Sequence, residues 1–261
     1  MRIQIDQSLD DYINVGDATT HALLLQNGPL LRAIRQTYAF FQSVLWSDLK
    51  EMTPVTMATG MNAFMLYVAG VRMAMTGHAS AIFPLLRTAL ESACYTFQMS
   101  QNSSLEKIWL DRHDDKQSHD ASRKAFGSAI KNTAAGLDAI DSGSGDFIKR
   151  VYDEAIDFGG HPNVRSILPN ISAEERDDAY HVQLGGLYGP EAVQVAQALV
   201  ACLDFGQAIG LTLLRSLKHP SEEMAQVFND LDFAKQCALV EIFNSQNGEP
   251  AATGATSSPA R

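Results

Sequence analysis

The sequence predicts an all-α fold, a helical bundle of about seven or eight helices. Nearly every long segment places apolar residues at the 3.6-residue spacing of an amphipathic helix. Hydrophobic residues make up 46% of the 261 residues and charged residues 19%, an ordinary globular mixture in a chain long enough to bury a sizeable core. Residues 161–189 are the least helical part, and there we expect an irregular or short-stranded insert.

The apolar spacing predicts helices over 29–48, 55–76, 79–101, 104–113, 117–140, 146–159, 190–217 and 221–244. Several of the ends carry their own signals. Ser103 followed by Glu106 is the pattern of a capping box. Pro190 fits the first turn of a helix, and Pro220 follows a stretch at which a helix should stop.

We expect three parts along the chain. Residues 1–28 form an N-terminal segment, and residues 29–245 form a single helical bundle domain. Residues 246–261 are rich in small and polar residues, and such a segment buries too little apolar surface to offset the entropy lost on ordering. They are therefore predicted to be a disordered tail.

The charge of the chain and its cysteines exclude some classes of function. A formal net charge of -10 opposes a general electrostatic grip on nucleic acid or on an anionic membrane, so no DNA partner is expected. The three cysteines, Cys94, Cys202 and Cys237, are widely spaced within apolar helical patterns and match no CxxC motif. We expect them to be buried free thiols in a reducing cytoplasm.

Residues 55–75 are the most apolar stretch and require a comparison with a membrane span. Asn62 and Arg72 interrupt the stretch, and no basic clusters flank it. The pattern therefore favours a buried central helix, with no membrane partner. The N-terminus is acidic and lacks the long apolar core of a secretory signal, so a cytoplasmic location is expected.

The helix predicted over 79–101 carries Arg87 and Glu91 one turn apart in an otherwise apolar run. The apolar residues of this helix form one broad face, and the two charged residues fall towards the other side. Taken by itself, this pattern indicates a solvent-exposed ion pair. The alternative is a polar seam where this helix meets its neighbours.

Two motifs resemble those of a group of uncharacterised bacterial helical proteins. "GHASAIFP" followed by "LLRTALES" looks like a helix of that group with a Leu-Arg-xxx-Glu motif, and "VYDEAIDFGGHPNVRS" resembles its later His-bearing motif, with Tyr152 and His161 at the matching positions. The group is similar to the HEPN-like superfamily of helical bundles, which includes RNA-cleaving toxins and antiphage effectors. The resemblance covers roughly residues 55–215.

The resemblance implies that Arg87, Glu91 and His161 converge inside the bundle as a polar seam, with a structural or ligand-binding role. Without it, "GGHPN" is typical of a helix stop, in which a glycine takes the left-handed conformation and Pro162 blocks continuation. His161 would then only bond free carbonyls at the helix end.

HEPN ribonucleases carry an Arg, a short spacer and then a His, and two stretches here have that form: Arg72 to His78 and Arg176 to His181. In such a site His moves the 2′-hydroxyl proton and Arg stabilises charge on the phosphoryl oxygens, without a metal. Roughly one such spacing is expected by chance in a chain of this composition. The structural alternatives are a helix C-terminal cap for the first pair and an exposed loop for the second.

Other chemistry has weaker signals, and no cofactor or metal is expected. Asp111, Asp115 and His119 have helical spacing suited to a metal, but Lys116 and the polarity of the stretch favour a solvated helix. The main cationic cluster is interleaved with aspartates, and RNA contact there is an alternative. It comprises Lys107, Arg112, Lys116, Arg123, Lys124 and Lys131.

Three functional hypotheses follow. The first is a cytoplasmic bundle with a structural or ligand-binding Arg/Glu/His seam, acting in stress or phage defence. The second is a metal-independent endoribonuclease of HEPN type. The third is a homodimeric interaction protein, which would expose an apolar patch larger than a few hundred Å².

Overall fold

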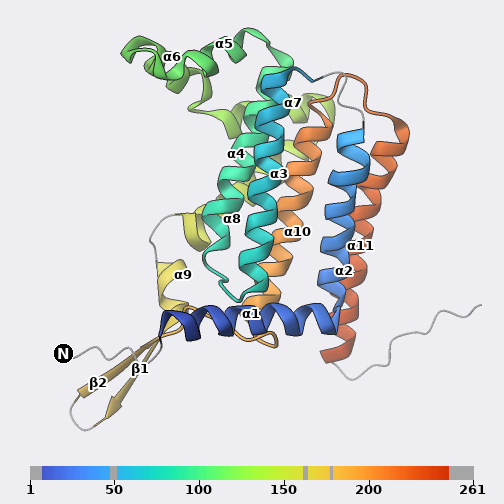
Figure 1. The fold of residues 1–261 in the computed structure, drawn as a ribbon. Coiled ribbons are helices and arrows are strands. Elements are labelled where there is room, and N and C mark those ends of the chain that lie inside the picture. The colour runs from blue at the N-terminus through green and yellow to red at the C-terminus, as the bar shows by residue number, and fades with distance from the viewer. Residues whose placement is uncertain (1–7, 48–51, 161–163, 177–178, 247–261) are drawn as a thin grey trace, which may run out of the picture.

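A computed structural model describes residues 8–47, 52–160, 164–176 and 179–246 of the chain. Within these residues it contains eleven α-helices and one two-stranded hairpin, which confirms the predicted all-α class (Figure 1). The α-helices are α1 (Leu9–Gln26), α2 (Pro29–Ala39), α3 (Pro54–Met75), α4 (Ile82–Gln101), α5 (Ser104–Leu110), α6 (Lys116–Phe126), α7 (Ala129–Ile140), α8 (Ser144–Ala155), α9 (Val164–Ile167), α10 (Val193–Leu214) and α11 (Glu222–Gln246). The strands are β1 (Ile171–Arg176) and β2 (Ala179–Leu184), and short π- and 3₁₀-turns extend α2, α5, α8 and α9.

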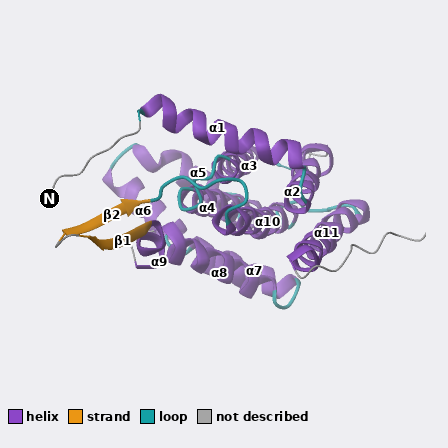
Figure 2. Ribbon diagram, turned by 90° about the horizontal axis from the view of Figure 1, so that it is seen from below, coloured by secondary structure: helices purple, strands orange, loops and turns teal. Residues whose placement is uncertain are grey.

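Helices α3, α4 and α10 form the centre of the bundle. Helices α2 and α11 pack together on one side and α7 and α8 on the other, while α1 lies across the ends of the long helices (Figures 1 and 2). Close packing of α3 on α4 depends on Gly70, where a Cβ would lie 2.7 Å from a methyl group of Leu86. Helix α10 is buried over most of its length, with Phe205 and Ile209 fully enclosed, because neighbours cover it on several sides.

The predicted helix over 117–140 is wrong in one respect, since the chain divides there into α6 and α7. Gly127 ends α6 with its N–H bonded to the carbonyl of Arg123, and a Cβ at Gly127 would lie 2.5 Å from that oxygen. Ser128 then leaves the helical region with φ -119° and ψ 34°. The apolar periodicity continues through this break, so it did not reveal the turn.

Two predicted helix starts are also corrected. Ser103 makes no side-chain cap; instead Asn102 Oδ1 accepts from the Ser104 N–H at 3.1 Å. Glu106 does not reach back to Ser103, because its carboxylate accepts from Thr53 Oγ1 at 2.8 Å. Pro190 lies before α10, which begins at Val193.

Helix α1 falls within the segment that the sequence left unassigned. It begins with a capping box between Ser8 and Asp11. Arg72 at the end of α3 holds α1 by an ion pair to Asp17 at 2.8 Å. His78 packs edge-on against the Tyr12 ring, with centroids 5.3 Å apart. Arg72 and His78 therefore both anchor α1, and the His78 backbone N–H also bonds the Met73 carbonyl in the last turn of α3 at 3.0 Å, which is the helix-end role expected for this pair.

The hairpin β1–β2 occupies the predicted insert and confirms its short-stranded form. The strands are antiparallel, with Glu174 paired to His181 and Arg176 to Ala179. Tyr188, beyond the hairpin, returns the chain to the bundle by a backbone hydrogen bond to Gly77.

Helices α3 and α10 are long and apolar enough to cross a membrane by length and composition alone. The core helix of a globular protein passes the same test, and 78% of the α10 window is buried in the bundle against 39% of the α3 window. The expected cytoplasmic location stays a prediction.

The cysteine prediction is correct for two residues and wrong for the third. Cys94 and Cys202 are buried free thiols, and burial raises the pKa of Cys94 to about 12. Cys237 is an exposed free thiol, because it lies on the side of α11 that faces away from the core.

Candidate functional site

Arg87 and Glu91 form part of a three-residue cluster with Tyr152 from α8. Arg87 Nε donates to Glu91 Oε1 at 3.0 Å, and the Tyr152 hydroxyl donates to the same oxygen at 2.9 Å. The Arg87 guanidinium also lies over the Tyr152 ring, 5.3 Å from its centroid. The side chains of Arg87 and Glu91 are only 25% and 32% exposed, so the solvent-exposed pair indicated by the local pattern is corrected to a half-buried cluster.

The helix faces explain this arrangement. Leu86, Leu90 and Cys94 on α4 are fully buried, which leaves Arg87 and Glu91 at the edge of the packed face. Helix α8 lies along that edge (Figure 1). The two charged residues therefore meet a neighbouring helix while one side of each stays open to solvent.

The predicted partner His161 lies outside the described residues. The resemblance implied that Arg87, Glu91 and His161 converge, and that convergence stays a prediction. Tyr152, which belongs to the same motif, does contact both members of the pair.

A cavity of about 490 Å³, which we call the seam cavity, opens beside this cluster. Arg87, Glu91 and Tyr152 line it together with the α6–α7 junction at Ser128 and the side chains of Lys131 and Lys149. Its lining contains three basic residues and one carboxylate. The start of α7 contributes too, because Ser128 makes no side-chain cap and leaves backbone N–H groups of the first turn available.

The electrostatics of the cluster favour hydrogen-bond donation. Burial and the hydrogen bond to Glu91 both raise the pKa of Tyr152, so its hydroxyl stays protonated at neutral pH. Burial opposes the charge of Arg87, but the bond and attraction to Glu91 outweigh it and raise the pKa of Arg87. The cluster is thus suited to binding the oxygens of a ligand rather than to removing a proton from one.

The second predicted pair, Arg176 and His181, lies on the hairpin. His181 of β2 pairs with Glu174, which lies two residues before Arg176 on β1, while Arg176 pairs with Ala179. The register therefore places Arg176 and His181 at neighbouring positions on the same face of the hairpin. Their side chains lie outside the described part of the structure. Catalysis by this pair stays a prediction.

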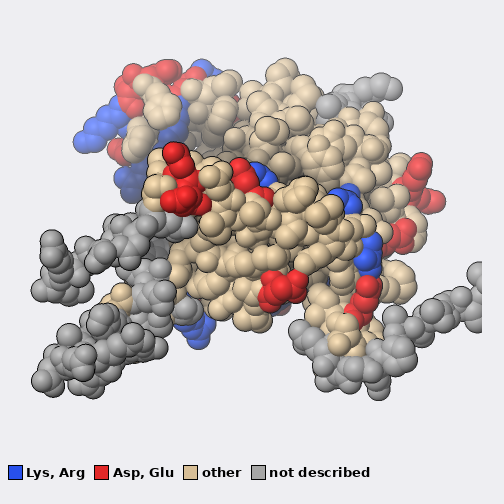
Figure 3. All heavy atoms as spheres, turned by 60° about the horizontal axis from the view of Figure 1, so that its bottom comes forward, with Lys and Arg blue, Asp and Glu red and all other residues tan. Residues whose placement is uncertain are grey.

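The other predicted groups on α5 and α6 make local contacts. Lys107 pairs with Asp111 at 2.7 Å, and Asp115 accepts from the Ser118 N–H as the cap of α6. Among the described residues no group of three His, Cys, Asp or Glu side chains is placed to hold a metal. In Figure 3 the visible Lys and Arg side chains lie mixed with Asp and Glu, as the aspartate interleaving of the cationic cluster predicts.

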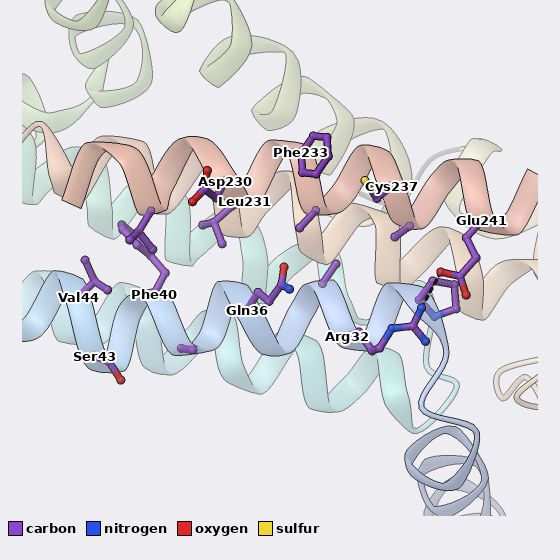
Figure 4. A pocket seen from close by; sticks show the side chains of 16 residues that line it. Arg32, Gln36, Phe40, Ser43, Val44, Asp230, Leu231, Phe233, Cys237 and Glu241 are labelled. Atoms are coloured by element: carbon purple, nitrogen blue, oxygen red, sulfur yellow. Dashed lines mark hydrogen bonds and ion pairs between the residues drawn. The ribbon is translucent and has the colours of Figure 1, made fainter. Parts of the chain in front are cut away.

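A groove of about 570 Å³ between α2 and α11, which we call the α2–α11 groove, was not predicted from the sequence (Figure 4). Phe233 and Cys237 of α11 lie along it opposite Gln36 of α2, and an ion pair of 2.6 Å between Arg32 and Glu241 closes one end. Phe233 is 71% exposed and Val240, on the same side of α11, is 57% exposed. The spacing 233, 237, 240 is visible in the sequence as a second apolar stripe.

A buried ion pair was also missed. Lys235 Nζ of α11 lies 2.6 Å from Asp204 Oδ1 of α10, with side chains 11% and 13% exposed. Gln207 Oε1 accepts a further bond from the same ammonium at 3.2 Å. Neither residue stands out in the sequence, because nothing local shows that two such distant helices meet there.

Comparisons with protein-family models, curated proteins and solved structures give no match to this chain.

Proposed function

We propose that this chain is a ligand-binding helical bundle, and that its seam cavity takes a small anionic ligand. The observation that carries the proposal is the charge of the lining. In a chain whose formal net charge is -10, three basic residues line this cavity. Glu91 pairs with Arg87 and Asp146 pairs with Lys149 at 2.7 Å, which leaves Lys131 with no ion-pair partner among the described residues. Because the chain as a whole is negative and repels anions, a local excess of positive charge favours anion binding in this cavity over binding elsewhere on the surface.

The cluster also supplies geometry for such a ligand. Glu91 holds the Arg87 guanidinium by one edge, which fixes its orientation before a ligand arrives. Lys131 is exposed and can move onto a bound carboxylate or phosphate, whereas Lys149 would share such a ligand with Asp146, its ion-pair partner at 2.7 Å. The backbone N–H groups at the start of α7 add the donors of a helix N-terminus.

Isothermal titration of the full chain with orthophosphate, pyrophosphate and citrate at low ionic strength tests the proposal. We expect at least one of these anions to bind, and Lys131→Ala to weaken that binding about tenfold, as loss of one charge-assisted contact does. Lys124→Ala is the matched control, because Lys124 is an exposed lysine on α6 outside the cavity lining. Absence of binding by all three anions, or equal effects of the two substitutions, would refute the proposal.

The α2–α11 groove favours a second candidate function, that of a homodimeric interaction protein. Phe233, Cys237 and Val240 form an exposed stripe beside an open groove. A phenylalanine side chain buries roughly 150–250 Å² when it is covered, so Phe233 alone contributes on the order of 100–180 Å² to an apolar patch of the kind found at interfaces. A second copy that packs its own α11 here would cover both stripes at once.

Light scattering coupled to gel filtration tests this candidate. We expect a dimer that Phe233→Ser converts to monomer, and oxidative cross-linking through Cys237, whose thiol is exposed while Cys94 and Cys202 are buried. Leu110→Ser is the control, since Leu110 is 58% exposed on α5, away from the groove. A monomeric wild-type chain at micromolar concentration contradicts this candidate.

A role in stress or phage defence belongs to the same proposal and is supported by the motif resemblance alone. RNA cleavage in a metal-free buffer would support the ribonuclease alternative at Arg176 and His181, and we expect Arg176→Ala to abolish such cleavage.

A further inference from the structure

A separate cavity of about 310 Å³ lies on the other flank of α8, and we call it the α8–α10 cavity. It is enclosed by the start of α4, the end of α8, the α9 segment, Tyr188 and one side of α10. It shares no lining residue with the seam cavity. Its volume falls in the range of small-molecule sites, roughly 300–1,000 Å³.

One wall of this cavity is aromatic. The rings of Phe83 and Phe158 lie 5.8 Å apart between centroids at an interplanar angle of 31°, which is a tilted stack. Phe158 remains 43% exposed. A partly open phenyl face next to a second ring is a platform on which a further flat ring can stack.

The charged groups around the cavity are already neutralised by neighbours. Asp204 pairs with Lys235 at 2.6 Å, and Glu154 with Arg150 at 3.0 Å. Arg165 pairs with Asp157 at 2.6 Å. Because each charge of the lining has an opposite partner, the cavity selects for no charge on its occupant.

The uncharged polar side chains of the cavity differ in whether they already form hydrogen bonds within the protein. Asn170 is fixed, since it donates to Ser80 Oγ and to the Ser166 carbonyl and accepts from the Tyr188 hydroxyl. In contrast, the side-chain amides of Gln194 and Gln197 form no hydrogen bond in the described part of the structure. They are one helical turn apart on α10 and both line the cavity.

We propose that the α8–α10 cavity binds a neutral, planar heteroaromatic ring of the nucleobase type. The ring stacks on Phe158, and its polar edge pairs with the amides of Gln194 and Gln197. A carboxamide presents a donor and an acceptor side by side, which matches the alternating donors and acceptors on the edge of such a ring. A purely apolar ring would gain no hydrogen bond from either amide, and an ion would gain nothing from the paired charges.

Titration calorimetry of the full chain with adenine, uracil and benzene, each as the free compound, tests the inference. We expect one of the two bases to bind and benzene to bind at least tenfold more weakly. Phe158→Leu and Gln194→Leu should each weaken base binding tenfold or more. Gln117→Leu, at an exposed glutamine of α6 outside the cavity lining, is the matched control and should leave base binding unchanged.

Thermal unfolding of each variant separates a lost ligand from a lost fold, and Phe158 and Gln194 are both exposed enough to be replaced without opening the core. Absence of binding by both bases up to millimolar concentration would overturn the inference. Undiminished base binding by folded Phe158→Leu or Gln194→Leu, or equal binding of benzene, would overturn it as well. Because anion binding in the seam cavity is measured with different probes, each result stands apart from the other.

Discussion

Removal of one partner of the Lys235–Asp204 ion pair should destabilise the bundle more than any surface ion pair does. The Lys235 side chain is only 11% exposed, and Asp204→Ala leaves its ammonium with the side-chain carbonyl of Gln207, at 3.2 Å, as its remaining acceptor. Breaking a buried pair in this way costs about 3–5 kcal/mol, because an uncompensated charge remains buried. Urea denaturation measures the loss: with a slope of about 3 kcal/mol/M, the midpoint should fall by about 1–1.7 M.

Two controls sharpen this test. Glu241→Ala removes the partner of Arg32, in a pair whose side chains are both 47% exposed, and should cost less than about 1 kcal/mol. The double variant Asp204→Leu/Lys235→Met replaces both charges by apolar groups and should recover most of the stability, since a buried pair is often no better than its hydrophobic equivalent. A cost below about 1 kcal/mol for Asp204→Ala would show that water reaches the ammonium and would refute the reasoning.

Three further predictions concern α1, the thiols and the core. Burial lowers the pKa of His78 below 6.5, so the folded protein favours the neutral imidazole. The neutral His78 ring therefore contributes its full stabilisation of the fold above pH 6.5, and this stabilisation is lost as the pH falls through the lowered pKa. Hydrogen exchange of α1, corrected for the intrinsic rate, should therefore accelerate on acidification, and His78→Asn should remove that response. Cys237 should react at once with a thiol reagent in the native protein, whereas the two buried cysteines react only after unfolding. Gly70→Ala should cost about 1–3 kcal/mol in chemical denaturation, because its Cβ would lie 2.7 Å from a leucine methyl; an unchanged midpoint would mean that the leucine moves aside freely.

The fold class was predictable because most helices of this chain bury an apolar stripe. Helix α1 was not, because it buries Gly16, Thr19, Thr20 and a single leucine against the bundle. Its larger apolar residues Leu9 and Leu25 are 72% and 73% exposed. Where small and polar residues make the contact, hydrophobic periodicity carries no information about which side is buried.

The break between α6 and α7 shows a related limit. Periodicity over 117–140 stays in phase across Gly127 and Ser128, and a lone glycine in a helical pattern is often tolerated. The turn is decided by packing, since Phe126 and Ala129 on either side of it are both buried and fix where the chain must go. Sequence pattern alone gives no such constraint.

The candidate site was predictable in part for a different reason. Helical spacing placed Arg87 and Glu91 on the same side of α4, but it could not decide whether that side met water or another helix. The structure places α8 along the edge of α4, and the Tyr152 hydroxyl converts an ordinary i,i+4 pair into a cluster joining two helices. The resemblance named the Tyr152 motif, and spacing alone would not have linked it to residues sixty positions earlier.

The way α8 packs explains why both cavities lie beside it. Ile148, Val151 and Ala155 are fully buried and form a narrow strip down one side of the helix. At 100° per residue, Tyr152 falls on one flank of that strip and Glu154 on the other, so each flank faces a different neighbouring helix. The flank towards α7 gathers basic residues, of which Lys131 alone has no ion-pair partner among the described residues, and the flank towards α10 gathers paired charges, aromatic rings and free amides. One short helix therefore separates two chemically distinct cavities, and substitutions in one should leave ligand binding in the other unchanged.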